Sequence, residues 1–245
     1  ATDAIVERLQ RGGRLIFVGA GTSGRLGVLE AAECPPTFGT PPELVQALIA
    51  GGDAALRGVV EGVEDAEQAG HVDLALLAVT ALDAVVVLSA SGHCRYVLGA
   101  LAEAVTRDAL TVAVTCNPGT PLEALAEFPI VPIVGPEVIA GSTRLKAATA
   151  QKMVLNMIST AAMVRLGKTL GNLMANVQAG ANEKLRQRAV RIVAEAELIP
   201  EVKAAYLLEA AGGEIKTAIL AHRAGVPPDE ARRRLQAAGG QLRDA

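Results

Sequence analysis

The first two thirds of the chain alternate between short apolar runs rich in β-branched residues and longer segments with helical spacing of apolar positions. The strand-like runs are RLIFV (14–18), AVVVLS (84–89), LTVAVT (110–115) and FPIVPIV (128–134), with LVQALIAGG (44–52) as a weaker candidate. Because parallel neighbours need crossover connections, this alternation predicts an α/β fold, a three-layer sandwich built on a mainly parallel sheet.

After GPEVIAGS (135–142) the pattern changes to helices alone. The segment 143–168 is largely free of proline and has apolar residues three and four positions apart. Further helices are expected at 182–197, 200–213, 213–225 and 227–240, the last opened by a proline. We therefore expect a first domain at residues 1–180 and a C-terminal helical subdomain at residues 181–245.

Composition excludes several classes of protein. The 245 residues are 51% hydrophobic but only 2% aromatic, and the formal net charge is −3, so no basic footprint for nucleic acid is present. The sequence holds no apolar run long enough to predict a membrane span. Three widely spaced cysteines, Cys34, Cys94 and Cys116, form neither a zinc motif nor a disulfide framework, which favours a cytoplasmic protein without a structural metal.

The stretch GAGTSG (19–24) joins a predicted buried strand to a predicted helix. In open parallel sheets, ligands bind beyond the carboxyl ends of the strands, where helix N-termini direct free N–H groups outward. Glycines allow the backbone to approach an anion closely, and Thr22 and Ser23 add hydroxyl donors without bulk. We expect Thr22, Ser23 and Gly24 to contact a phosphate group.

Two further loops have the same character. SASG (89–92) follows the strand-like run at 84–89 and leads into a helix near Tyr96, which makes Ser91 and Gly92 candidates for the same ligand. GSTR (141–144) is expected to open the long helix, where simple N-capping by Ser142 or Thr143 explains the residues equally well.

A dinucleotide site is the main alternative for the first loop. Gly19, Gly21 and Gly24 match G-x-G-x-x-G, but such a site should also have an acidic residue about 20 positions further on. Asp53 lies about 30 positions beyond the glycines, so a phosphate monoester fits the loop better. With no G-K-[ST] ending, the phosphate is expected to be a substrate handle and not the transferred group.

Acidic residues supply the candidate chemistry. Glu33 precedes Cys34-Pro35, and since Pro35 disfavours helix at Cys34, we expect the helix to end there with Glu33 at its C-terminus. A carboxylate at that end opposes the helix dipole, which favours a raised pKa, although a solvated surface acid is the simpler interpretation. In VVEGVEDAEQAG (59–70), spacing does not choose between Glu61 and Glu64.

These motifs belong to longer segments that carry a family resemblance. The segments are GRLIFVGAGTSGRLGVLEAAECPPTFGTPPELV, IAGGDAAL, VEGVED, SASG, CNPGTPLE, GPEVIAGSTRLKAATAQKMVLNM and GKTLGNLMANV. Together they resemble the N-acetylmuramic acid 6-phosphate etherases, bacterial proteins with a sugar isomerase (SIS) domain. The chain is also similar to the vertebrate glucokinase regulatory protein, which shares the fold but is not an enzyme. After SASG the etherases usually have Arg-Thr-Pro, where this chain has His93-Cys94-Arg95.

The resemblance implies a fold, a reaction and the residues that perform it. The fold is SIS-type, a flavodoxin-like doubly wound sheet. The reaction cleaves the lactyl ether of N-acetylmuramate 6-phosphate to N-acetylglucosamine 6-phosphate and D-lactate, in a homodimer without metal or organic cofactor. The family's catalytic glutamates map onto Glu33, as proton donor to lactate, and Glu64, as its partner acid/base.

The sequence leaves one functional alternative. A non-catalytic regulator that senses a sugar phosphate would need the same phosphate-binding loops but would have no need of a paired acid and base. The presence of both Glu33 and Glu64 therefore favours the etherase, an enzyme whose partner is a small sugar phosphate and neither nucleic acid nor a membrane.

Overall fold

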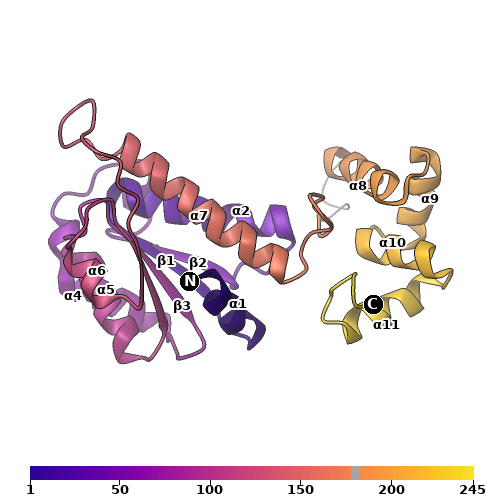
Figure 1. The fold of residues 1–245 in the computed structure, drawn as a ribbon, viewed down its shortest axis with the longest axis horizontal. Coiled ribbons are helices and arrows are strands. Elements are labelled where there is room, and N and C mark those ends of the chain that lie inside the picture. Colours follow the sequence, from indigo (N-terminus) through magenta and orange to yellow (C-terminus); the bar gives the residue numbers. More distant parts are fainter. Residues whose placement is uncertain (178–182) are drawn as a thin grey trace. The chain divides into compact units, whose positions relative to one another are not determined.

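The structure is a computed structural model that describes residues 1–177 and 183–245. The chain forms two compact units, one of residues 1–33 and 41–162 and one of residues 34–40 and 163–245 (Figure 1). The boundary expected between residues 180 and 181 lies outside the described residues and stays a prediction.

The first unit is built on five parallel strands in the order β2-β1-β3-β4-β5. The strands are β1 (Leu15–Gly19), β2 (Val45–Ile49), β3 (Ala84–Leu88), β4 (Leu110–Val114) and β5 (Phe128–Ile130). This order is the flavodoxin-like one, in which the chain reverses direction across the sheet between β1 and β3. The predicted three-layer fold with a parallel sheet is confirmed.

The strand at the edge is shorter than its apolar run. β5 ends at Ile130, although the predicted run continues to residue 134. Pro129 and Pro132 lack the N–H group that a sheet ladder uses, so proline is tolerated only at an edge such as this one. All of the other predicted strands form, including the weaker candidate, which becomes β2.

Helices cover both faces of the sheet, with α2 and α7 on one face and α4, α5 and α6 on the other (Figure 1). The helices of this unit are α1 (Thr2–Gln10), α2 (Gly21–Phe38), α3 (Ala54–Arg57), the 3-10 turn η1 (Val63–Asp65), α4 (Glu67–Leu76), α5 (Arg95–Thr106), α6 (Pro121–Leu125) and α7 (Lys146–Arg165). Both α2 and α7 have residues in each unit.

Side chains alternate between the two faces of the strands. Ile16, Val18, Val85 and Val87 belong to the core that also includes α4 and α5. On the other face, Gly27 of α2 lies against β1 and β3. The three central strands, β1, β3 and β4, are buried along their whole length, which explains why they are continuous apolar runs in the sequence.

The second unit contains only helices among its described elements, as the sequence predicts. They are α8 (Glu183–Glu197), α9 (Glu201–Ala210), α10 (Ile215–Ala224) and α11 (Pro228–Ala237). Ile192, Val193, Leu208 and Ile219 form its own apolar core. No helix of the described chain is long and apolar enough to cross a membrane.

The amino ends of β1 and β3 are joined by a buried ion pair. Asp83 is only 2% exposed and accepts hydrogen bonds from the Arg14 N–H, from the Arg14 Nε and Nη2 (2.8, 3.0 and 2.8 Å) and from the Thr80 N–H. Burial alone would raise the pKa of Asp83, but the Arg14 and Thr80 hydrogen bonds outweigh it and lower the pKa.

Asp83→Asn should lower the free energy of unfolding at about pH 7 by about 1.5–3 kcal/mol, because hydrogen bonds to a charged group are lost. Since the folded pKa lies below the unfolded value, the stabilisation is complete above about pH 4 and disappears as the pH falls through the folded pKa. Urea unfolding of both proteins at about pH 7 and about pH 3 should therefore show a difference that shrinks at the lower pH. The exposed Asp53→Asn provides the control, and an equal loss at both pH values would contradict the role of the charge.

Candidate functional site

A cavity of about 470 Å³ lies where β1 and β3 end. Its walls come from the turn after β1 (residues 20–23 and 25), the turn after β3 (88–91, 93 and 94) and the segment around α3 and η1 (55, 58–60 and 63–65), with Thr143 from the loop before α7. It therefore occupies the point at which the strand order reverses, the usual ligand position in this class of sheet.

The first turn is shaped by two glycines in contact. A Cβ atom on Gly24 would lie 2.7 Å from the Gly19 carbonyl oxygen and 2.6 Å from Ile49 Cγ1, so neither the strand nor the helix leaves room for a side chain. This close approach sets the N-terminus of α2 directly on the end of β1. Thr22 and Ser23 line the cavity, whereas Gly24 is buried and does not line it.

Ser23 is held by a residue of α7. Its Oγ donates a hydrogen bond to Gln151 Oε1 at 2.7 Å, and Gln151 Nε2 donates to the Val114 carbonyl at 3.4 Å. Because that carbonyl can only accept, the Gln151 amide oxygen must face Ser23, and the hydroxyl proton of Ser23 is used inside the protein. Thr22, which is more exposed than Ser23, is the better hydroxyl donor to a ligand in this turn.

The second turn is closed on itself by hydrogen bonds. Ser89 Oγ accepts from the Gly92 N–H at 3.1 Å, and Ser91 Oγ accepts from the His93 N–H at 3.3 Å. Gly92 has φ +76°, and a Cβ there would lie 2.5 Å from Thr120. Ser89 and Ser91 line the cavity, while Gly92 shapes the turn from a buried position without lining it.

The third loop differs from its prediction. The long helix begins at Lys146, after GSTR, and its first free N–H groups, those of Lys146 and Ala147, donate to the Glu137 carboxylate at 2.9 Å each. These bonds, that from Ala147 first, lower the pKa of Glu137. Capping by Ser142 or Thr143 is therefore wrong, because a carboxylate from earlier in the loop has taken the helix N-terminus. Thr143 alone reaches the cavity wall.

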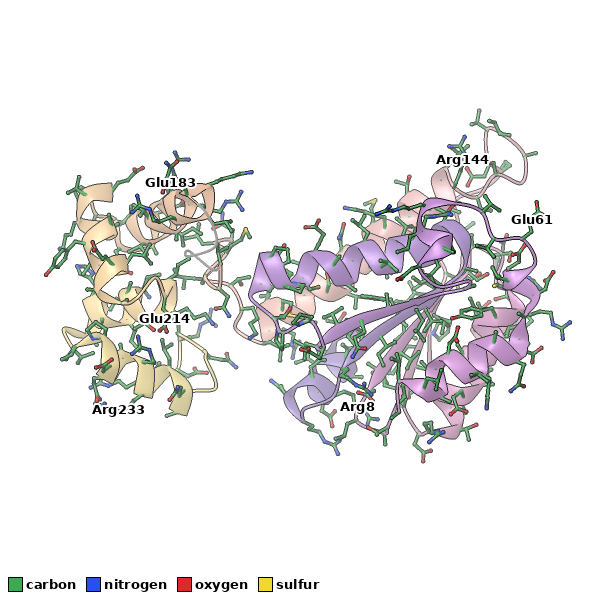
Figure 2. All side chains as sticks on the ribbon, turned by 180° about the vertical axis from the view of Figure 1, so that it is seen from behind. Arg8, Glu61, Arg144, Glu183, Glu214 and Arg233 are labelled. Atoms are coloured by element: carbon green, nitrogen blue, oxygen red, sulfur yellow. The ribbon has the colours of Figure 1, made fainter. Side chains whose placement is uncertain are left out.

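The two candidate acids of 59–70 separate in the structure. Glu64 lies in η1 and lines the cavity, together with Asp65. Glu61 is exposed, does not line the cavity, and its side chain projects outward in Figure 2. The structure thus brings Glu64, and not Glu61, to the predicted phosphate loops.

A cysteine fastens η1 to the start of α5. Cys94 Sγ donates to the Glu64 carbonyl at 3.3 Å, and burial raises the pKa of this thiol. Cys94 stands where the resemblance places a threonine, another short side chain with a donor. It anchors the backbone of Glu64 beside the second turn.

Glu33 is not at the end of a helix. α2 continues through Pro35 and Pro36 to Phe38, so the helix end expected at Cys34 is wrong. Each interior proline removes a helix hydrogen bond and costs about 3 kcal/mol. Burial of Cys34 and Phe38, which are 1% and 7% exposed, and a bond from the Gly39 N–H to the Pro35 carbonyl offset this cost.

Glu33 is also remote from the cavity of its own chain. It lies twelve residues after Gly21 on one helix, roughly 18 Å along the axis at about 1.5 Å per residue. Its side chain is exposed and does not line the cavity. The structure therefore joins Thr22, Ser23, Ser91 and Glu64 in one place and leaves Glu33 outside it.

Sequence reasoning missed one cation of the site. Arg25, the fifth residue of α2, lines the cavity and donates to the carbonyls of Leu56 and Gly58. Its place directly after the last glycine of GAGTSG is a signal that could have identified it. Among the described residues, no group of three or more His, Cys, Asp or Glu side chains is arranged to hold a metal ion.

A second cavity, of about 600 Å³, lies in the helical unit and contains none of the predicted residues. Lys216 lines it and donates to the carbonyls of Gly167 and Gly240 at 2.6 and 2.7 Å. Burial lowers the pKa of Lys216 to about 8. This amine fastens two glycine turns of the helical unit.

Known proteins resemble the chain in sequence and in fold. Residues 1–105 match the glucokinase regulatory protein N-terminal SIS domain, and residues 55–161 match the SIS domain. A phosphoheptose isomerase from Francisella tularensis has a TM-score of 0.52 at 20% identity, covering 66% of this chain and 83% of its own. An Escherichia coli CFT073 protein, c3406, has a TM-score of 0.52 at 17% identity, covering 70% of this chain and 78% of its own.

Sequence relatives are far closer than these structures. N-acetylmuramic acid 6-phosphate etherase from Rubrobacter xylanophilus is 58% identical over all 245 residues of this chain and 80% of its own length. The Salmonella dublin protein of the same name is 53% identical over the whole chain and 82% of its own length. With identity this high along the whole sequence, the chain belongs to the N-acetylmuramic acid 6-phosphate etherase family.

Proposed function

We propose that the chain cleaves the D-lactyl ether of N-acetylmuramate 6-phosphate to N-acetylglucosamine 6-phosphate and D-lactate, as a lyase of cell-wall sugar recycling. The observation that carries the proposal is that Glu64 lines the same cavity as the hydroxyl turns after β1 and β3. Relatives that are 48–58% identical over the whole chain and are named etherases support it.

The phosphate group binds at the N-terminus of α2. Free N–H groups in the first turn of a helix and the positive end of its dipole favour an anion there. The Thr22 hydroxyl donates from that turn, and Ser91 donates from the opposite wall. Ser23 contributes through its backbone, since its hydroxyl is bonded to Gln151. Gly24 acts only by shaping the turn, because its N–H donates to the Ala20 carbonyl at 3.1 Å.

Glu64 performs acid–base chemistry on the anchored sugar. In the open-chain aldehyde the C2–H is acidic, so one carboxylate removes this proton while a carboxylic acid protonates the ether oxygen on C3. The C3–O bond breaks, lactate leaves and a C2=C3 double bond forms. Water then adds at C3 and a proton returns to C2. General acid–base catalysis of this kind contributes about 10²–10⁴-fold for each group.

The second acid, Glu33, comes from another copy of the chain. Glu33 is too far along α2 to reach the cavity of its own chain. The exposed surfaces of α2 and α7 are partly apolar. Leu29, one turn before it, is 48% exposed, and Met153 and Met157, one turn apart on α7, are each 59% exposed. Exposed apolar side chains on these helices favour a homodimer that brings Glu33 to the cavity of a second copy.

Glu64 bears on the alternative function, and the cysteines bear on the cellular location. A regulator that only senses the sugar phosphate would bind it in this cavity without releasing lactate, and Glu64 in the cavity favours catalysis. Cys34, Cys94 and Cys116 are not joined in disulfides, which supports a reducing cytoplasm.

The direct test of the function is a coupled D-lactate assay. The purified chain should release one D-lactate for each N-acetylmuramate 6-phosphate consumed, without added metal. Binding of the sugar phosphate with no lactate would instead establish the regulator.

Glu64→Gln should lower kcat by about 10²–10⁴-fold and change the affinity for the sugar phosphate little, because the amide keeps the shape of the side chain but cannot exchange a proton. The matched control is Glu61→Gln, three residues away and outside the cavity. Steady-state kinetics of both variants decide the matter. Turnover by Glu64→Gln at the rate of the control would remove Glu64 from the mechanism.

Ser91→Ala should weaken binding of phosphorylated sugar by roughly tenfold or more, because a hydrogen bond to a charged group is lost. Unphosphorylated N-acetylmuramate should bind to the variant and to the wild type with the same affinity. Calorimetry with both sugars measures the difference, and Thr106→Ala, at the other end of α5, is the control. An equal loss of affinity for the two sugars would show that Ser91 does not bind the phosphate.

A further inference from the structure

One cation lines the cavity and has no role in the mechanism above. Of the described residues in the cavity wall, Arg25 is the only Arg or Lys. It is the fifth residue of α2 and is partly buried. A guanidinium cannot be deprotonated in a protein, so it presents a permanent positive charge to whatever binds there.

The backbone of another segment fixes where this charge lies. Arg25 Nε donates to the Leu56 carbonyl at 3.2 Å, and Nη2 donates to the Gly58 carbonyl at 2.5 Å. Both carbonyls belong to the stretch that runs from α3 to η1, and η1 carries Glu64. The two contacts use only part of the planar set of N–H donors, which leaves further donors for a ligand.

The charge therefore lies on the acidic side of the cavity. Glu64 and Asp65 both line this wall. Any carboxylate that entered here would meet two acids, and an uncompensated approach of like charges is unfavourable. A guanidinium in the same cavity offsets that repulsion and offers the paired geometry that suits a carboxylate.

The substrate brings a carboxylate to this place. N-acetylmuramate 6-phosphate has two anionic groups, the phosphate on C6 and the lactyl carboxylate, which is joined through a single carbon to the ether oxygen on C3. If the phosphate binds at the N-terminus of α2 and Glu64 acts at C2 and C3, the lactyl carboxylate must lie close to Glu64. The product N-acetylglucosamine 6-phosphate keeps the phosphate and loses the carboxylate.

We propose that Arg25 binds the lactyl carboxylate and is the residue by which the site distinguishes its substrate from other 6-phosphorylated amino sugars. This inference rests on the proposed function. It also explains how the product is released, because breaking the C3–O bond separates the group bound to Arg25 from the group bound at the phosphate turns.

The experiment compares Arg25→Gln and Arg25→Lys with wild type, and Arg57→Gln is the matched control. Arg57 belongs to the neighbouring α3 but is exposed and does not line the cavity. Three quantities are measured for each protein: KM for N-acetylmuramate 6-phosphate, KM for its lactyl amide, which has the same shape without the charge, and the inhibition constant of N-acetylglucosamine 6-phosphate.

Arg25→Gln should raise KM for the carboxylate substrate by about tenfold or more. KM for the lactyl amide and the inhibition constant of N-acetylglucosamine 6-phosphate should stay within about twofold of their wild-type values, so that the variant no longer prefers the carboxylate to the amide. Arg25→Lys, which keeps the charge without the planar fork, should restore part of the preference. Arg57→Gln should match wild type.

Two other outcomes would overturn the inference. If Arg25→Gln raises the inhibition constant of N-acetylglucosamine 6-phosphate as much as it raises KM for the substrate, then Arg25 binds the phosphate or supports the cavity wall through Leu56 and Gly58. If the variant still has a lower KM for the carboxylate substrate than for the lactyl amide, another group binds the carboxylate. Failure of the proposed function is separate, because wild type would then release no lactate from either compound.

Discussion

The contact between Gly19 and Gly24 is the constraint on which the rest of the site depends. With no side chain at either position, the first turn of α2 lies against the end of β1 at a distance that a single Cβ would forbid. That approach directs the N-terminus of a long helix into the cavity and sets Thr22 and Arg25 on its wall. A wider turn between β1 and α2 would move the Thr22 hydroxyl, the Arg25 guanidinium and the N-terminus of α2 away from their present places in the cavity wall.

The parallel sheet places a second turn of the same kind beside the first. Because β1 and β3 are neighbours in register, the turn after β3 lies beside the turn after β1, and Ser91 faces the same space as Thr22. Cys94 then fastens the backbone of Glu64 next to the second turn. One cavity thus combines hydroxyl groups, a carboxylate and a guanidinium, to which the proposed function assigns the phosphate, the proton transfer and the lactyl carboxylate.

Much of this arrangement could be predicted from the sequence, because it depends on local rules. Strands buried on both faces appear as apolar runs, and the glycine and hydroxyl residues after β1 and β3 indicated the two turns that line the cavity. The end of α2 could not be predicted, since the rule against helix before Pro35 is a local cost that distant burial of Phe38 overcomes. The role of Glu137 could not be predicted for the same reason, because its partners are backbone N–H groups that only folding brings near. Arg25 could have been identified from its place after the GAGTSG glycines, but its contacts with the Leu56 and Gly58 carbonyls depend on folding.

In the proposed mechanism two acids act on one bound sugar, and Glu33 does not line the cavity of its own chain that Glu64 lines. Mixing Glu33→Gln with Glu64→Gln under conditions that exchange subunits tests this most directly. The account predicts that two inactive proteins together recover about a quarter of wild-type lactate release, because half of the dimers are mixed and each mixed dimer has one site with both glutamates. A mixture that stays inactive, although subunit exchange is shown to occur, would contradict it.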